Sequence, residues 1–467
     1  MTLHDRDIER DVEELEEALW AAIRNHESPD VLAAIEAVRS AALASRRGRV
    51  EQDAIDRALA GNTEDVNAAV VRALTIYFQL INLAEERARI RTIRENGNGP
   101  LSDSIHEAID RLDARDVSAE TIGRVLEDVR VVPTFTAHPT EARRKTIKGL
   151  LQRIADHLER LDQRRLTDDE RRDIHSRLDA VVEGLWTTKH IRNRSPEPFD
   201  EARNVHWYLV NVIMEVIPEV YDEIETRLDE AYDDPPPVPS ILSFRSWAGS
   251  DADGNPNVTP DVTAETLDRQ RRLVLESYRS SLADLESVLT QDEKRTTTDA
   301  VERSLEADRE RIPGVVESAI DRYPGEPFRQ KTVVVGERVD RVDDVKPGGY
   351  ESVEEFLGDL ELLATELRDN DLHSVVDTHL ESLMRQVETF GFHLASLDLR
   401  DHRELHTEAI AEALDFENVA YREMNEDERV EFLTESILQT GSVIDLDAPV
   451  SPPSERVLER FDALADW

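Results

Sequence analysis

His138 follows a short β-branched segment and is the residue of this chain best placed to do chemistry. Residues 131–136 predict a buried strand, because valine, threonine and phenylalanine dominate the run. Pro139 keeps His138 extended and suits the first turn of the helix that we expect to begin there. A histidine between a strand end and a helix N-terminus is positioned to act on a bound anion.

Three cations, Arg143, Arg144 and Lys145, strengthen the case for an anion. They lie in the first turns of the expected helix, where the helix dipole favours carboxylates over cations. A chain with 101 acidic residues has many ways to avoid this placement. A bound anion explains it; the alternative is that the three are solvated surface residues paired with nearby carboxylates.

A second group of polar residues follows the predicted strand at 241–247. Trp247 ends this strand, and a loop rich in glycine, aspartate and asparagine occupies 249–260. Acidic and amide residues alternate from Asp251 as in a calcium loop, but the sixth and twelfth positions hold proline and valine instead of glycine and glutamate. We therefore predict a rigid, hydrogen-bonded loop at the carboxyl end of a strand. By itself, Trp247 is typical of a core residue.

A third predicted strand covers 393–400, alternates in hydropathy and ends on Arg400. From the residues alone, Arg400 fits equally well an ion pair with Asp398 or Asp401 and a contact to an anionic ligand. Three strands that each end in polar residues and precede a helix favour the ligand contact. The reason is that parallel barrel strands place their carboxyl ends on one face.

These motifs carry a resemblance to one enzyme family. Residues 136–141, Thr-Ala-His-Pro-Thr-Glu, followed by a basic pair, resemble the histidine motif of the phosphoenolpyruvate carboxylases. The loop at 249–260 is similar to the family's tryptophan loop, with Ala252 where the family usually has arginine. The strand at 393–400 resembles one that ends in an anion-binding arginine, and residues 77–85 resemble a helix near the family's N-terminus. The resemblance covers nearly the whole chain but only the N-terminal half of the family's length.

The resemblance implies carboxylation of phosphoenolpyruvate by bicarbonate to oxaloacetate and phosphate, an anaplerotic carbon-fixing reaction that uses Mg²⁺ or Mn²⁺ in a homotetramer. His138 is then the catalytic histidine, which promotes the loss of carbon dioxide from carboxyphosphate. Arg400 binds an anionic group of the substrate, and Trp247 lines the hydrophobic pocket beside it. An anion- or effector-binding role is further implied for Arg143, Arg144, Lys145, Arg192 and Arg203, with a subunit contact as an alternative for the last two.

The family's metal-binding carboxylates, active-site lysine and mobile arginine loop lie in the half of its length that this chain lacks. We therefore expect no metal ligand here, and we expect the C-terminal half to supply the Mg²⁺ ligands and the remaining strands. The chain alone is expected to be inactive. The alternative function belongs to another class of protein: an inactive helical scaffold or effector-binding fragment that needs a partner chain. Co-purification with a separately encoded C-terminal half would favour the enzyme.

The wider sequence predicts a mainly α fold with a few parallel strands, which the resemblance makes an incomplete (β/α) barrel. We expect an N-terminal helical region over 1–130 and the first part of the barrel, with long helical insertions, over 131–467. Ser118 is the predicted cap of a helix ending near Asp128. Residues 331–339 have strand propensity and are interpreted as a connector. Apolar periodicity predicts further helices at 8–25, 64–93, 141–165, 168–190, 261–290, 297–311, 352–369 and 454–464.

The composition excludes several partners and locations. A net charge of −44 argues against nucleic acid as a partner. The absence of cysteine excludes disulfides and thiolate metal sites. The first residues lack a signal-type apolar run, and the most apolar stretch, 207–217, is too short to span a bilayer. We therefore expect a cytoplasmic protein without a membrane segment.

The acidic, lysine-poor composition indicates a very salty cytoplasm, such as that of a halophilic archaeon. At molar salt the Debye length falls to about 3 Å, so repulsion between the many carboxylates is screened.

We expect folding to depend on molar salt, because 101 acidic residues face only 57 basic ones and dilution restores long-range repulsion. The helical circular-dichroism signal and the melting temperature should both fall between molar and millimolar KCl. Unchanged values would contradict this prediction.

Overall fold

The computed structural model describes residues 6–46, 54–95, 104–136, 145–162, 165–189, 197–253, 255–342, 344–438, 444 and 449–464. The fold is mainly helical with a small parallel sheet of three strands. Two compact units interleave along the chain: unit 1 comprises 1–108 and 141–195, and unit 2 comprises 109–140 and 196–467. The chain passes from one unit to the other three times. The division at residue 130 that the sequence suggests stays a prediction.

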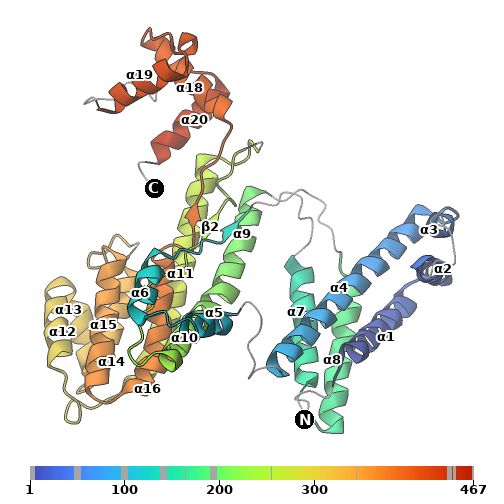
Figure 1. Cartoon of the computed structure of the whole chain (residues 1–467), viewed down its shortest axis with the longest axis horizontal. Coiled ribbons are helices and arrows are strands. Elements are labelled where there is room, and N and C mark those ends of the chain that lie inside the picture. The colour runs from blue at the N-terminus through green and yellow to red at the C-terminus, as the bar shows by residue number, and fades with distance from the viewer. Residues whose placement is uncertain are drawn as a thin grey trace. The chain divides into compact units, whose positions relative to one another are not determined.

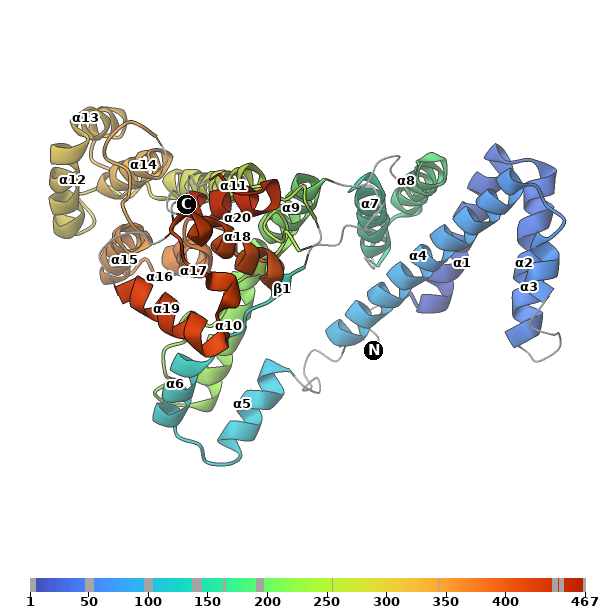
Figure 2. The same cartoon turned by 90° about the horizontal axis from the view of Figure 1, so that it is seen from above.

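Unit 1 is a helical bundle (Figures 1 and 2). α1 packs against α4 and α8, and α7 packs against α8. Its core includes Ile76, Ile154 and Trp186, all buried. Helices α7 and α8 belong to unit 1 because they pack against α1 and α4. Its helices are α1 (Ile8–His26), α2 (Pro29–Arg46), α3 (Ala54–Leu59), α4 (Glu64–Glu95), α7 (Lys145–Leu161) and α8 (Asp168–Thr187).

Helix α4 is long and apolar enough, by length and composition, to cross a membrane. Its buried stripe packs into the core of unit 1 through Val70, Ile76, Leu80 and Ala84. A core helix of this kind meets the same criteria, so α4 is only weak support for a membrane span.

Unit 2 contains the sheet and the remaining helices, with α5 (Ile105–Asp113) at its boundary. The side chain of Ser118 accepts a hydrogen bond from the backbone of Thr121 and caps α6, as predicted. Further elements of unit 2 are α6 (Ala119–Asp128), β1 (Thr134–Phe135), α9 (Pro198–Tyr208), the π-helical turn η1 (Leu209–Ile213), α10 (Met214–Ala231), β2 (Arg245–Ser246), α11 (Pro260–Val288), α12 (Asp299–Arg311) and α13 (Pro313–Arg322). The unit continues with α14 (Pro327–Asp340), α15 (Val353–Asp369), α16 (His373–Val375), η2 (Val376–Leu380), α17 (Glu381–Phe390), β3 (Ser396–Leu397), α18 (Arg403–Phe416), η3 (Tyr421–Glu423), α19 (Glu426–Leu438) and α20 (Pro452–Ala463).

The three strands pair in the order β1-β2-β3, and both pairings are parallel. The prediction of a few parallel strands is therefore confirmed. Within the described part of the chain, β1 and β3 are the edges of the sheet. A specific incomplete barrel stays a prediction.

The segment 131–136 is less buried than predicted. Ladder bonds do extend back from β1, since the Val131 N–H donates to the Ile241 carbonyl at 2.8 Å. Val131 and Val132, however, are 46% and 41% exposed. The prediction of a buried strand is wrong for this segment, because an edge strand has a neighbour on one side only.

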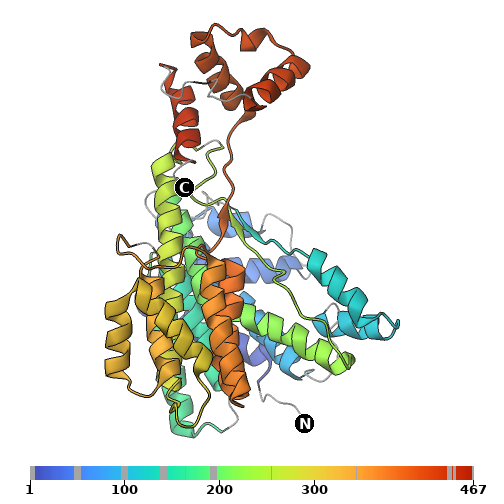
Figure 3. The same cartoon turned by 90° about the vertical axis from the view of Figure 1, so that its left-hand side faces the viewer.

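Residues 331–339 form most of helix α14 instead of the predicted connector. Lys331, Val335 and Arg338 recur at helical spacing and are buried together. α14 packs along α11, which Figure 3 shows running through the unit. Tertiary burial therefore outweighs the strand propensity of the three consecutive valines.

A buried ion network explains the charged residues inside this helical layer. The Lys331 ammonium, which is fully buried, lies 2.7 Å from Asp308 and 2.7 Å from Asp359. The Arg338 guanidinium contacts the same two carboxylates, and the Tyr350 hydroxyl donates to Asp359 at 2.7 Å. Each buried charge is thus paired, which is the condition for burying it at tolerable cost.

The last helices, α18, α19 and α20, form a small cluster of their own (Figures 1 and 3). α18 packs against α20, and α20 also contacts α11. α19 has no buried residue, and Val430, Ile437 and Leu438 on it are largely exposed.

Asp308→Asn should lower the free energy of unfolding by about 3–5 kcal/mol, because it leaves the buried Lys331 and Arg338 charges without one of their partners. Urea denaturation in molar KCl, followed by circular dichroism, measures the change. Asp321→Asn, at an exposed position on α13, is the control and should alter stability by less than about 0.5 kcal/mol. Equal effects of the two substitutions would contradict the role given to the network.

Candidate functional site

The strand register gathers a polar face at the carboxyl ends of the strands. Thr134, Arg245 and Ser396 are aligned across the sheet, and Phe135, Ser246 and Leu397 follow them. Since side chains alternate along a strand, Arg245 and Trp247 share a face with Ser396 and Asp398. The opposite face carries Phe244, which is buried against Phe390 with ring centroids 5.4 Å apart.

Asp398 joins the second and third strands on this polar face. One of its carboxylate oxygens accepts a hydrogen bond from the Trp247 indole at 3.1 Å, and the other lies 3.2 Å from the Arg245 guanidinium. Trp247 is thereby oriented by a charged acceptor and is only partly buried. Sequence reasoning missed Arg245, although a lone cation between Phe244 and Ser246 in a predicted strand was a usable signal.

Arg400 completes the group, because its guanidinium lies 4.0 Å from the centre of the Trp247 ring. It also lies 3.5 Å from Asp251, at the limit of a hydrogen bond, and its side chain is 40% exposed. The ion-pair partners considered from the sequence are wrong: Asp398 pairs with Arg245, and Asp401 pairs with the buried Arg460 at 2.8 Å. A half-exposed guanidinium with one weak carboxylate contact keeps donors available for an anion.

The loop after Trp247 is hydrogen-bonded along its length, as predicted. The backbone N–H of Ala252 donates to the Arg400 carbonyl at 2.9 Å, which ties the loop to the third strand. Gly249 has a φ of +86°, and a Cβ there would lie 2.4 Å from the hydroxyl of Thr266, so the turn requires glycine. The Ser250 hydroxyl donates to the Asp398 carbonyl at 3.0 Å.

Helices hold the strands from outside the sheet. The Tyr221 hydroxyl on α10 accepts hydrogen bonds from the Ile241 and Leu242 N–H groups, at 2.9 and 3.1 Å. From α11, the Gln270 side chain accepts from the Ala395 N–H at 2.9 Å, and the Tyr278 hydroxyl donates to the Gly391 carbonyl at 2.8 Å. Burial raises the pKa of Tyr278 well above its usual value, so this hydroxyl stays a donor.

Most of the remaining candidate residues lie outside the part of the chain that the structure describes. His138, Arg143, Arg144 and Arg192 lie outside the described residues, as does the side chain of Lys145, the first residue of α7. Arg203 is exposed on α9 and forms no hydrogen bond or ion pair with the described residues of the site.

The described residues do not offer a divalent-metal site. Among them, no three histidine or carboxylate side chains converge as metal ligands would. Near the site, Asp251 faces Arg400, and Asp253 lies 2.8 Å from His402.

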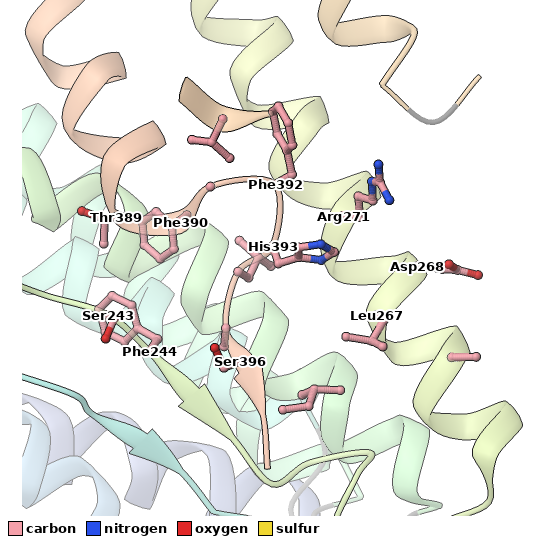
Figure 4. Close-up of a pocket in the computed structure, with 16 residues that line it drawn as sticks. Ser243, Phe244, Leu267, Asp268, Arg271, Thr389, Phe390, Phe392, His393 and Ser396 are labelled. Atoms are coloured by element: carbon pink, nitrogen blue, oxygen red, sulfur yellow. The ribbon is translucent and has the colours of Figure 1, made fainter. Parts of the chain in front are cut away.

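A pocket of about 520 Å³ borders residues 389–397, which include Ser396 of the polar face, and Ser243 and Phe244 just before β2. Figure 4 shows Phe244 and Phe390 on one wall, and His393 pointing from the segment before β3 towards α11. A smaller pocket of about 190 Å³ adjoins the loop after Trp247 and includes His402 and Arg456.

Parallel strands whose carboxyl ends carry charged side chains and precede helices form the kind of arrangement in which α/β enzymes hold their sites. The family model described as phosphoenolpyruvate carboxylase matches residues 8–467. This chain therefore belongs to the phosphoenolpyruvate carboxylase family.

Curated relatives agree with this assignment. Phosphoenolpyruvate carboxylase of Xanthomonas euvesicatoria pv. vesicatoria (strain 85-10) is 33% identical over 419 residues, which cover 88% of this chain and 46% of that protein. The enzyme named likewise from Roseiflexus castenholzii (strain DSM 13941 / HLO8) is 32% identical over 85% of this chain and 44% of its own length. The phosphoenolpyruvate carboxylase of Rhodothermus marinus is 30% identical over a stretch that covers 96% of this chain and 50% of that protein. The chain spans about half the length of these relatives.

Proposed function

We propose that this chain carries the catalytic histidine and a substrate-binding arginine for the carboxylation of phosphoenolpyruvate by bicarbonate. The observation that carries the proposal is the meeting of Trp247, Asp398 and Arg400 at the ends of two parallel strands in a member of this family. Arg400 binds the carboxylate or phosphate of the substrate, and Trp247 keeps water from the reactive species.

The position of His138 is inferred from the strand register. Phe135 is aligned with Ser246 and Leu397, and His138 and Arg400 each lie three residues further along their own segments. Beyond the strands, Arg400 is bridged to Asp251 of the second segment. His138 is also an even number of residues from Thr134, the partner of Arg245. An extended backbone would give its side chain the same face as Trp247. The register of the described strands therefore supports a role for His138 beside Arg400.

The proposed reaction has two parts. A bicarbonate oxygen attacks the phosphorus of phosphoenolpyruvate and the bond from phosphorus to the enol oxygen breaks, giving carboxyphosphate and the enolate of pyruvate. Carboxyphosphate then loses phosphate to give carbon dioxide, which the enolate carbon captures as oxaloacetate. His138 promotes the second part, and the indole of Trp247 shields the carbon dioxide and the enolate.

The family uses a divalent metal ion, Mg²⁺ or Mn²⁺, and the described residues do not provide its ligands. We infer that the ligands come from the part of the family's length that this chain does not span, on the same or another polypeptide. The two edge strands and the apolar pocket beside β3 (Figure 4) support the idea that further strands and helices of the family pack here, because unpaired strand edges are ordinarily covered.

The remaining assignments extend the same proposal. We place the assembled enzyme in the cytoplasm of a salt-loving cell, in line with the acidic composition. We also assign it the homotetrameric state of its family. The cations Arg143, Arg144, Lys145, Arg192 and Arg203 are proposed to bind an anionic effector.

The 467-residue chain alone should form no oxaloacetate and should not bind Mn²⁺ tightly, because hard divalent cations need several oxygen ligands. A coupled malate-dehydrogenase assay in high salt tests activity, and calorimetry with Mn²⁺ tests binding. A polypeptide that covers the rest of the family's length, supplied in trans, should restore both activity and binding. Turnover by the isolated chain would overturn the inference that the metal ligands come from the part of the family's length that this chain does not span.

In the restored enzyme, His138→Asn should abolish oxaloacetate formation while keeping bicarbonate-dependent release of phosphate, because the first part of the reaction does not need the imidazole. Phosphate and oxaloacetate are measured in parallel. His373→Asn, at an exposed histidine on α16, is the matched control and should keep both activities. Normal carboxylation by His138→Asn would remove this histidine from the chemistry.

A further inference from the structure

The carboxylate of Asp398 lies near two arginines of the polar face but pairs with only one of them. Arg400 follows Asp398 by two residues on the segment that continues β3, so both side chains leave the same side of the backbone. Such neighbours are expected to form an ion pair. Asp398 instead lies 3.2 Å from the guanidinium of Arg245 on β2, and Arg400 lies over the ring of Trp247.

Both oxygens of the Asp398 carboxylate are engaged away from Arg400. One accepts a hydrogen bond from the Trp247 indole at 3.1 Å, and the other faces Arg245. The backbone of Asp398 is fixed as well, since its N–H donates to the Ser246 carbonyl at 3.0 Å. A rotation of the Asp398 side chain is therefore the movement that would bring this carboxylate to Arg400.

The surroundings of Arg245 give it one clear task. Its partners across the sheet, Thr134 and Ser396, carry no charge. Among the described residues, Asp398 is the one carboxylate within ion-pair distance of its guanidinium. The Arg245 side chain is 54% exposed, so it does not fill the core of the unit. The carboxylate that it holds therefore explains a cation at this position.

We propose that Arg245 is a positioning residue for the anionic substrate: it holds Asp398 away from Arg400 and so leaves the Arg400 guanidinium to the substrate. The inference rests on the anion-binding role proposed above for Arg400. The described carboxylate that does contact Arg400 is Asp251, at 3.5 Å, which is the limit of a hydrogen bond. A closer pair with Asp398 would occupy the same N–H donors in place of the substrate.

This effect acts through contact and not through the long-range field of the Arg245 charge. In molar salt the Debye length is about 3 Å, so loss of that charge alone is largely screened from a ligand held by Arg400. Formation of a partly exposed ion pair between Asp398 and Arg400 is not screened in this way, and it would lower the affinity for the substrate about fivefold.

The test is a titration of the full chain with phosphoenolpyruvate in molar KCl, followed by the fluorescence of Trp247. A Trp247→Phe variant identifies the part of the signal that comes from this residue among the five tryptophans. Arg245→Gln should weaken binding about fivefold, because Asp398 is then free to pair with Arg400. Arg245→Lys keeps a cation beside Asp398 and should bind more tightly than Arg245→Gln. Arg303→Gln, which removes an exposed arginine on α12, is the control and should bind like the parent.

The decisive variant combines Arg245→Gln with Asp398→Asn. Asparagine keeps the shape of aspartate and the oxygen that accepts from the Trp247 indole, but it has no charge to attract Arg400. The double variant should therefore recover the affinity of the parent, and Asp398→Asn alone should bind no more weakly than the parent. A direct contact between Arg245 and the substrate would instead leave the double variant as weak as Arg245→Gln.

Three results would overturn the proposal: parent-like binding by Arg245→Gln, weak binding by the double variant, or no response of Trp247 to phosphoenolpyruvate in the parent. The same variants in the restored enzyme separate this inference from the proposed function. There, Arg245→Gln should raise the KM for phosphoenolpyruvate about fivefold and leave kcat unchanged, since uniform binding is lost. An assembled parent that forms no oxaloacetate would contradict the proposed function, whereas the titration of the chain would still decide the role of Arg245.

Discussion

The parallel hydrogen-bond ladder between β1, β2 and β3 is the constraint on which the candidate site depends. It aligns Arg245 with Ser396 although 151 positions separate them in the sequence. A slip of one residue would turn Arg245 and Trp247 to the apolar face and bring Phe244 to the polar one. The ladder thus decides which side chains meet, and the contacts among Trp247, Asp398 and Arg400 follow from its register.

The strands are too short to maintain that register unaided. Each has two residues in the regular ladder, well below the length of an independently stable sheet. Side chains from α10 and α11 supply the missing order by bonding the backbone just before β2 and β3. The helical layer behind α11 is fixed in turn by the paired charges around Lys331. The precision of the site therefore originates in buried helices as much as in the sheet.

Much of this arrangement was predictable from local pattern. The long periodic helices, the Ser118 cap and the three strand ends follow from spacing and cap chemistry alone. The pairing of Arg400 with Asp251 and the support from Tyr221 and Gln270 were not predictable, because such contacts join residues far apart in sequence and leave no local signal. Helix α14 was missed because consecutive valines favour a strand until burial on one helical face outweighs that preference. The role of His138 stays a prediction.

The separation of the strands along the chain has a consequence for synthesis on the ribosome. Between Thr134 and its partner Arg245 lie about 110 residues, so at roughly 5–20 residues per second β1 emerges about 6–20 s before β2. The third strand follows after a still longer interval. During that time the nascent chain presents Val131 and Val132 on an unpaired extended segment, which is a template for aggregation.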